Sequence, residues 1–459
     1  MNRRLDVRLR RGAIGFFESV VKRRPVFRYW RELEQSQWWS TDRLEALQVA
    51  RLRELLSRAA LHSPWHSARW RELGLRPESI TSTADLATWP LIDRQTIREH
   101  RSEMLSTESG LRMITKATGG SSGVPLKFDL DTGSQDRRMA AWNRGYGWAG
   151  AEPGTRQWYL WGVPPDATAG WRKRKGRLYD RFHRRTVESC FDLSEERVEE
   201  FAASLARARP DAIVAYTGAL HSLARMFEER GIVPFQPGSI VVGAEQLHDF
   251  QRETIERVFR APVFETYGSR EFMLIGAECE CHAGLHLTAE HLIVEVVDDD
   301  GHAVAPGTEG DVAITDLTNF GMPFVRYRNG DRAVAAEGAC ACGRNLPMLA
   351  RVTGRRLDVL TTPDGRRLPG EFFPHIVKDF ASVERFQVEQ SEPEYVTLRL
   401  VAPEWTDEEE TRIRREIAAV AGGALQVRIE LVERIPLSGA GKLKVVVNRL
   451  AEAGTAAIQ

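Results

Sequence analysis

Residues 118–125, with the sequence TGGSSGVP, have the composition and spacing of a loop that could bind an anion. Glycine permits positive φ angles and close backbone approach, so successive N–H groups can turn toward a phosphate. The hydroxyls of Thr118, Ser121 and Ser122 would add side-chain donors. The stretch is not a Walker loop, because no Gly-Lys-Ser/Thr follows its last glycine. A flexible Gly/Ser hairpin has the same composition, so other stretches must decide between the two.

Further polar turns recur at domain-sized intervals along the chain. They are Gly243-Ala244-Glu245, Tyr267-Gly268-Ser269-Arg270-Glu271, the YRNGD stretch ending in Asp331, Gly354-Arg355, and the glycine-rich turn that ends in Lys442. The first two directly follow strand-like runs, and ligands of parallel sheets collect at the carboxyl ends of strands. These turns are therefore candidates for one common site.

Five cysteines are present, and four of them form two tight pairs, Cys279 with Cys281 and Cys340 with Cys342. An odd count argues against a disulfide framework, and thiolates with imidazole are typical ligands of a closed structural zinc site. We predict zinc ligation by Cys279, His282, Cys340 and Cys342, with Cys281 or His286 as alternatives to His282. Free thiols are the competing interpretation. Cys190 has no partner in sequence and is predicted to be a core residue.

Strand-like and helical segments alternate in the middle of the chain, which is typical of an α/β domain with largely parallel strands. The predicted strands are 158–161, 212–216, 239–242 and 263–267, and the predicted helices between them are 194–208, 220–230 and 248–259. Helices are also predicted over 42–73, 135–148 and 407–420. Short β runs at 292–297, 310–315 and 324–327 predict an antiparallel subdomain over about 285–350. The rest, from 356 to 459, reads as a small α+β unit.

Bulk composition excludes several classes of protein. With 459 residues the chain is too long for one core, and 64 basic residues balance 64 acidic ones, so no strong field invites nucleic acid. No apolar run is long enough to span a bilayer and no signal peptide is recognisable, so we expect a cytoplasmic location. The basic N-terminus (Arg3, Arg4, Arg8, Arg10 and Arg11) favours a solvated arm or docking helix, with weak peripheral membrane contact as the alternative.

The ordered series TGGSSGVP, GAE, YGSRE, YRNGD, TGR and GAGK resembles the adenylate-forming, acyl-activating superfamily, over about residues 48–449. The specific likeness is to its phenylacetate–CoA ligase branch, including relatives from capsular polysaccharide clusters. The resemblance implies a large N-terminal adenylation domain over 1–355 and a small mobile C-terminal lid domain over 356–459. It also implies ATP, Mg²⁺ and, usually, coenzyme A as cofactors.

Roles for individual residues follow from the same resemblance. Thr118, Gly119, Gly120, Ser121, Ser122 and Gly123 would grip the β- and γ-phosphates. Gly243, Ala244, Glu245 and Tyr267 would flank the adenine, with Gly268 and Ser269 in the same turn. Asp331 would accept hydrogen bonds from both ribose hydroxyls, and Arg355 would lie near the ribose and the phosphate. Glu271 would bind Mg²⁺, and Lys442 would neutralise charge between the carboxylate and the α-phosphate.

Three departures from the family pattern are visible. Arg270 replaces the usual Thr or Ser and is predicted to face away from Glu271, toward a carboxylate or the α-phosphate. Leu357 stands where relatives often carry a hinge aspartate, and Asp358 follows it. The loop over 361–367 differs from the segment that helps to form the thiol tunnel in that family.

The predicted function is ATP-dependent activation of a carboxylic acid to an acyl-adenylate, followed by transfer to coenzyme A. The alternative within enzymology is transfer to an amine, a carrier protein or a sugar. The alternative outside enzymology is a non-catalytic scaffold protein. Such a protein would have no physical need for Lys442 on a glycine turn. Segments around Trp161, Tyr216 and Tyr267 are aromatic or small, which favours an apolar or aryl acid.

Overall fold

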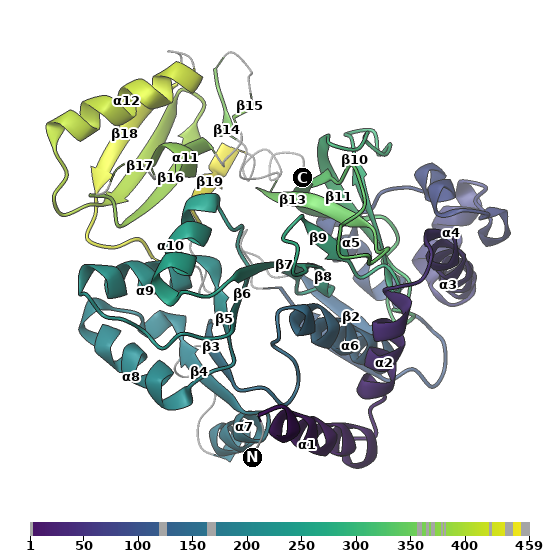
Figure 1. Cartoon of the computed structure of the whole chain (residues 1–459). Coiled ribbons are helices and arrows are strands. Elements are labelled where there is room, and N and C mark those ends of the chain that lie inside the picture. The colour runs from purple at the N-terminus through teal and green to yellow at the C-terminus, as the bar shows by residue number, and fades with distance from the viewer. Residues whose placement is uncertain are drawn as a thin grey trace.

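The structure is a computed structural model and describes residues 3–118, 126–162, 171–355, 360–363, 367–368, 372–377, 380, 382–421, 425–436 and 444–450. It begins with helices that pack against the main body (Figure 1). They are α1 (Arg3–Phe16), the π-helical turn η1 (Phe17–Val21), α2 (Val26–Ser36), α3 (Thr41–His62), α4 (Pro64–Glu72), the short 3₁₀ turns η2 (Pro77–Ser79) and η3 (Thr83–Thr88), and α5 (Arg94–Met104).

The single helix predicted over 42–73 is wrong, because α3 and α4 are separate helices. Ser63 between them has an extended backbone with φ −106°, and Pro64 starts the second helix at a position where its missing N–H costs nothing. The N-cap of α3 is Ser40, whose hydroxyl accepts from the N–H of Arg43 at 3.4 Å. Helix α3 therefore begins one residue before the predicted start at residue 42.

One sheet of eleven strands forms the frame of the molecule, in the order β10-β11-β12-β13-β9-β8-β7-β6-β5-β3-β4. Its parallel half consists of β3 (Gln157–Trp161), β4 (Arg185–Ser189), β5 (Ala212–Tyr216), β6 (Ser239–Gly243) and β7 (Val263–Ser269). The associated helices are α7 (Trp171–Phe182), the 3₁₀ turns η4 (Cys190–Asp192) and η5 (Glu195–Arg197), α8 (Val198–Ala208), α9 (Thr217–Glu229) and α10 (Asp249–Phe259). The predicted α/β alternation is confirmed, and Cys190 lies in the apolar core between these helices and the sheet.

The antiparallel half continues the same sheet from β7. It consists of β8 (Met273–Glu278), β9 (Leu285–Leu287), β10 (Leu292–Val297), β11 (Glu309–Asp316), β12 (Tyr327–Ala335) and β13 (Met348–Arg355). The predicted antiparallel region is therefore present but joined edge to edge with the parallel strands. The strand predicted at 324–327 starts only at Tyr327, because Arg326 has φ +49° and Phe324 is buried in the core before the strand begins.

A hairpin of β1 (Met113–Ala117) and β2 (Lys127–Asp131) leads into α6 (Thr132–Trp148). The carboxylate of Asp131 caps this helix by accepting from the N–H of Ser134 at 2.8 Å. Helix α6 packs against both α2 and β8. It therefore connects the N-terminal helices with the strand that follows the YGSRE turn.

The C-terminal part has its own four-stranded sheet, ordered β18-β17-β16-β19 (Figure 1). Its elements are β14 (Leu360–Thr361), β15 (Arg367–Leu368), α11 (Phe372–Val377), β16 (Arg385–Glu392), β17 (Tyr395–Val401), α12 (Asp407–Ala421), β18 (Gln426–Leu431) and β19 (Val446–Asn448). A separate apolar cluster runs through these elements. The domain boundary at 355/356 stays a prediction, since residues 356–359 lie outside the described part. Among the described helices, none has the length and apolar character needed to cross a membrane.

Candidate functional site

The carboxyl ends of the parallel strands β3, β5, β6 and β7 lie at one edge of the sheet, because neighbouring strands pair in parallel register. The GAE turn follows β6, and the YGSRE turn begins inside β7 and leads to β8. The edge is also where the sheet changes from parallel to antiparallel pairing. Such an edge is the usual location of ligand sites in α/β sheets.

A buried hydrogen-bonded cluster joins this edge to β12. The hydroxyl of Tyr267 donates to Oδ2 of Asp331 at 2.8 Å, and Nδ2 of Asn329 donates to the Tyr267 oxygen at 2.7 Å and to Asp331 Oδ2 at 2.8 Å. The N–H of Asp331 in turn donates to Oδ1 of Asn329 at 2.9 Å. Two motifs more than sixty residues apart therefore share one fixed network. Asn329 lies inside the YRNGD stretch, but its role was not predicted.

Arg355 ends β13 and stands directly opposite Asp331 in the β12–β13 register. Its backbone is therefore next to the predicted ribose-binding carboxylate. The side chain of Arg355 lies outside the described atoms, so its role stays a prediction.

Glu271 is 2% exposed and lies against three residues from distant parts of the chain. The hydroxyl of Tyr327 donates to its Oε1 at 3.3 Å, and Nη2 of Arg94 lies 3.6 Å from the same oxygen. The buried Arg138 donates to the backbone carbonyl of Glu271 and forms an ion pair with Asp316, so it holds the turn in place. Burial first and the Glu271 carboxylate second raise the pKa of Tyr327 above its usual value, which keeps that hydroxyl a donor.

The surroundings of Glu271 fit the predicted magnesium carboxylate. Mg²⁺ usually takes one or two carboxylates together with substrate phosphates, and Glu271 is a carboxylate fixed at the ligand edge. Neither Arg94 nor Tyr327 was predicted to contact Glu271. Arg94 belongs to no recognisable local motif, and Tyr327 begins the YRNGD stretch but was given no role there. Their positions depend on α5 and β12 approaching β7 through the fold.

Thr118 is the one described residue of the TGGSSGVP loop. It is buried, its N–H donates to the carbonyl of Leu126 at 3.0 Å, and its hydroxyl accepts from the N–H of Leu126 at 2.9 Å. These two bonds clamp the two ends of the loop together. The hydroxyl hydrogen of Thr118 is not used by either bond, so it can still be donated to an anion.

The other predicted phosphate ligands and the predicted catalytic lysine lie outside the described residues. They are Gly119, Gly120, Ser121, Ser122, Gly123 and Lys442, together with the hinge candidates Leu357 and Asp358. Their roles stay predictions.

Cationic side chains gather next to Thr118. Arg270 is exposed and its Nε lies 3.4 Å from the carbonyl of Ala117, whereas Glu271 is buried, so the two neighbours face different ways as predicted. Lys116 is half-buried on β1 and donates to Oε1 of Gln135. Burial first, then repulsion from Arg138 and Arg270, lowers the pKa of Lys116 to about 8. Lys116 was not predicted, because it precedes the recognisable loop.

Close packing explains why glycine is present at Gly243, in the GAE turn, and at Gly268. A Cβ on Gly243 would lie 2.4 Å from Oγ1 of Thr266, and one on Gly268 would lie 2.0 Å from the carbonyl of Met273, so neither site accepts a side chain. Ala244 has φ +70°. The carboxylate of Glu245 accepts from the N–H of Gly218 at 2.7 Å and so caps α9. This structural contact is additional to the predicted place of Glu245 beside the adenine.

Aromatic side chains lie at the ends of β3 and β5. The rings of Trp161 and Tyr216 are 4.3 Å apart between centroids. Burial raises the pKa of Tyr216 to about 12, with Cys190 and Glu245 adding to the shift. The pair supplies an apolar surface at the same edge as Tyr267, where the acyl pocket was predicted.

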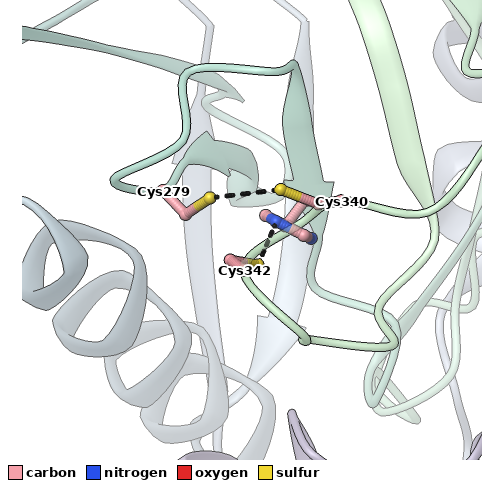
Figure 2. A group of neighbouring side chains, drawn as sticks. Cys279, Cys340 and Cys342 are labelled. Atoms are coloured by element: carbon pink, nitrogen blue, oxygen red, sulfur yellow. Dashed lines mark hydrogen bonds between the residues drawn. The ribbon is translucent and has the colours of Figure 1, made fainter.

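Three cysteines and a histidine form a second site at the other end of β8 (Figure 2). Sγ of Cys279 lies 3.6 Å from Sγ of Cys340, and Sγ of Cys342 lies 3.3 Å from Nε2 of His286. The four donor atoms lie within 4.8 Å of one another. Cys279 follows β8, His286 is on β9, and the other two precede β13, so three adjacent strands bring the cluster together.

His282 is not the fourth member of this cluster, which corrects the predicted ligand set. Its Nδ1 lies 3.1 Å from Oε2 of Glu278, and its ring packs on Phe264 at 4.6 Å. With φ +49° the residue turns the chain before Gly284. His286 takes the place predicted for His282, while Cys281 is exposed and outside the cluster.

The protonation chemistry of the cluster fits a metal. Burial, followed by repulsion from Arg344, lowers the pKa of His286 to about 4, so its imidazole is neutral at neutral pH and able to ligate. Burial opposes ionisation of Cys342, but the N–H of Arg344, 3.4 Å from Sγ, and its guanidinium outweigh that cost and lower the pKa of the thiol. Burial and neighbouring thiols raise the pKa of Cys279. A soft divalent cation would relieve this crowding of thiols by ionising them.

Known proteins resemble the chain in both sequence and fold. It is 25% identical to the phenylacetate-coenzyme A ligase of Thermus thermophilus, covering 89% of this chain and 97% of that protein. It is 22% identical to the protein CapK of Staphylococcus aureus, covering 94% of each. Residues 360–449 match the family model described as the CapK C-terminal domain. The predicted resemblance to the phenylacetate–CoA ligase branch is confirmed.

The fold is that of the adenylate-forming ligases. The chain superposes on 2-hydroxyisobutyryl-CoA ligase in its postadenylation state with a TM-score of 0.72 at 17% identity, over 92% of this chain and 93% of that one. The predicted α/β fold with a smaller C-terminal α+β region is therefore confirmed.

Proposed function

We propose that the chain is an ATP-dependent ligase that activates a carboxylic acid as its acyl-adenylate and transfers the acyl group to coenzyme A. The observation that carries this is the meeting of Glu271, the Tyr267–Asn329–Asp331 cluster and the cations beside Thr118 at one sheet edge. The similarity to a phenylacetate-coenzyme A ligase over nearly the whole chain supports the same assignment.

In the first step a carboxylate oxygen of the acid bonds to the α-phosphorus of ATP, and the bond to the β-phosphate oxygen breaks, releasing pyrophosphate. Two anions must meet, so catalysis depends on positioning and on cations and N–H donors. Glu271 would hold Mg²⁺, which would supply positive charge to offset that of the phosphates. Asp331 would orient the ribose, and Lys442 would stabilise the charge on the α-phosphate.

In the second step the sulfur of coenzyme A bonds to the acyl carbonyl carbon and AMP leaves. An amine, a carrier-protein thiol or a sugar hydroxyl would satisfy the same balance of bonds, so these acceptors remain the alternative. The adjacent rings of Trp161 and Tyr216 favour an apolar or aryl acid as the substrate.

Pyrophosphate release from ATP and a panel of aryl and aliphatic carboxylates tests the first step. Lys442→Ala should abolish release but leave transfer from preformed acyl-adenylate to coenzyme A largely intact. Lys444→Ala is the matched control, because Lys444 is two residues away and should tolerate truncation. Normal release by the Lys442 variant would remove its assigned role. No release with any acid from the wild type would favour a scaffold.

We also propose that Cys279, His286, Cys340 and Cys342 hold a structural zinc ion. The mixed thiolate and imidazole donor set and its burial support a closed tetrahedral site. Purified protein should retain about one zinc per chain after dialysis, and Cys340→Ser with Cys342→Ser should lose it and melt earlier. A metal-free protein with an unchanged melting temperature would contradict the assignment.

A further inference from the structure

Helix α1 presents an apolar face to solvent, which reverses the usual arrangement of a surface helix. Leu5, Leu9 and Phe16 are 51%, 60% and 63% exposed. At 3.6 residues per turn they lie within about 40° of one another on the helix circumference. The η1 turn continues the apolar surface with Val20 and Val21, which are 55% and 60% exposed.

The opposite face of α1 is anchored on the body of the protein. Ile14 is fully buried, and Nη1 of Arg184 lies 2.6 Å from Oδ2 of Asp6. Arg11 forms an ion pair with Glu152, and Gly154 approaches so closely that a Cβ there would lie 2.7 Å from the carbonyl of Val7. Asp6 and Arg11 are therefore paired with residues of the body, whereas Leu5, Leu9 and Phe16 remain exposed. Local fraying does not explain the exposure of the apolar residues.

Helix α7 extends the same surface. The rings of Phe17 and Phe182 meet at 5.2 Å, and Nζ of Lys22 lies 4.4 Å from the ring centroid of Tyr179, so α7 packs beside α1 and η1 (Figure 1). Leu178 on α7 is 68% exposed. The α1–η1–α7 surface therefore contributes six of the thirteen large apolar side chains that are exposed in the described residues. Scattered single residues need no explanation, but a concentration of this kind does.

Basic side chains border the apolar residues. Arg8 and Arg10 on α1 and Arg174, Arg177 and Arg181 on α7 are all exposed. The exposed apolar residues thus lie among guanidinium groups.

A recess of about 300 Å³ opens at the junction of α1, α7 and β4. Five arginines contribute to its lining, namely Arg10, Arg156, Arg181, Arg184 and Arg185. Asp211 pairs with Arg156 at 2.9 Å and Asp6 pairs with Arg184. Within the described residues Arg10, Arg181 and Arg185 form no ion pair with a carboxylate, so the recess has excess positive charge.

We propose that the α1–η1–α7 surface docks on an anionic phospholipid membrane, with a lipid phosphate in the arginine recess. Helices of this type lie in the membrane interface with apolar side chains in the acyl boundary and basic side chains at the headgroups. Each basic residue near an anionic bilayer adds attraction that falls off within a Debye length. Guanidinium groups also bind phosphate oxygens in bidentate geometry. This inference is independent of the proposed ligase activity.

Vesicle co-sedimentation of the full chain tests the proposal. The protein should bind vesicles of phosphatidylcholine mixed with phosphatidylglycerol, should bind phosphatidylcholine alone at least about tenfold more weakly, and should be released by added salt. Leu9→Glu and the pair Arg10→Glu with Arg181→Glu should each weaken binding by about tenfold or more. Leu61→Glu and Arg76→Glu are matched controls, because both residues are exposed on other helices or loops, and they should bind like the wild type.

Several results would overturn membrane docking. Absence of binding, equal binding to both vesicle types, or equal loss in the control variants would each do so. Light scattering after size exclusion tests whether a second copy of the chain binds this surface instead. A dimer that Leu9→Glu dissociates, together with no vesicle binding, would make this surface a protein interface. Circular dichroism melting shows whether each variant is folded. If Leu9→Glu does not fold, Leu9→Ser takes its place in the same assay. Glycerol phosphate that binds as tightly as vesicles would reduce the recess to a soluble phosphate site.

Discussion

The two ends of β8 hold sites of opposite character. Glu271 lies just before the strand, and Cys279 lies just after its last residue, Glu278, a separation of about 20–25 Å along the chain. The carboxylate is held by a tyrosine hydroxyl and an arginine, so it is stable without a further partner. The cysteines crowd against one another and an imidazole, and burial with the neighbouring thiols makes ionisation of Cys279 costly unless a cation joins them.

Because of this difference, we expect one site to contribute to the reaction rate and the other to stability. Under the proposed function the Glu271 end would present charge to ligands that arrive and leave, and its loss should reduce the reaction rate with little change in folding. The cysteine end joins three neighbouring strands, and its loss should reduce stability with little direct change in chemistry. Substitutions at the two ends therefore give a direct test of the comparison.

The largest expected effect is on the rate, at Glu271. Glu271→Gln keeps the size and the hydrogen bond from Tyr327 but removes the charge that would bind Mg²⁺. Pyrophosphate release should fall by about 100-fold or more, with the melting temperature nearly unchanged. Raising the Mg²⁺ concentration should restore part of the activity. A variant with full activity at low Mg²⁺ would show that the metal is held elsewhere.

The next effect is on stability, and it compares two histidines four residues apart. His286→Ala should lose zinc and lower the free energy of unfolding by about 3 kcal/mol or more, because the metal contributes directly to folding. His282→Ala should retain zinc and cost about 1 kcal/mol or less, since it breaks a partly exposed contact with Glu278 and one ring contact with Phe264. Zinc content and denaturant titration measure both. Zinc loss in the His282 variant alone would restore the original ligand prediction.

These two histidines also show how far sequence reasoning reaches. The cysteine pairs could be recognised because ligand types and local spacing are visible along the chain. The choice of histidine could not, because it depends on which strand lies beside β8, and β9 places His286 there. His282 is nearer in sequence but is held by Glu278.

The same distinction applies to the ligand edge. Tyr267, Glu271 and Asp331 belong to motifs whose order along the chain is visible. Arg94 and Lys116 belong to none, and they reach the site through the packing of α5 and β1. The alternation of strands and helices predicted β3, β5, β6 and β7 of the parallel half, whereas β4 and α7 were not predicted. The helix break at Pro64 depends on one local steric effect. The continuous eleven-stranded sheet depends on the pairing of β7 with β8.

A smaller effect is expected at Arg270, which faces solvent at the ligand edge. Arg270→Thr restores the commoner family residue and should reduce kcat/KM for the carboxylic acid. The loss should correspond to roughly 1.5–3 kcal/mol of transition-state stabilisation, the cost of one charged hydrogen bond. Arg270→Lys should recover little if the contact is bidentate. Stability should change by less than about 0.5 kcal/mol, because the side chain is exposed. Unchanged steady-state kinetics in the threonine variant would remove Arg270 from the chemistry.

The smallest expected effect is a change in pH dependence at Lys116. Its pKa of about 8 means that the side chain is charged below pH 8 and becomes neutral above it. A charged Lys116 would attract the phosphates of ATP, so kcat/KM for ATP should decline as the pH rises through 8. Lys116→Met should have a lower kcat/KM at pH 7 and a flatter profile between pH 7 and about 9.

The contribution of Lys116 to stability should change with pH in the opposite direction. The folded pKa lies below the unfolded value of 10.5, so the unfolded chain binds more protons between about 8 and 10.5, and the Lys116 contribution to the free energy of unfolding rises with pH there. Below pH 8 the penalty for burying the charge is fully present, and Lys116→Met should remove it. A variant with the wild-type pH profile of kcat/KM would show that Lys116 does not face the phosphates, even if its stability followed the predicted course.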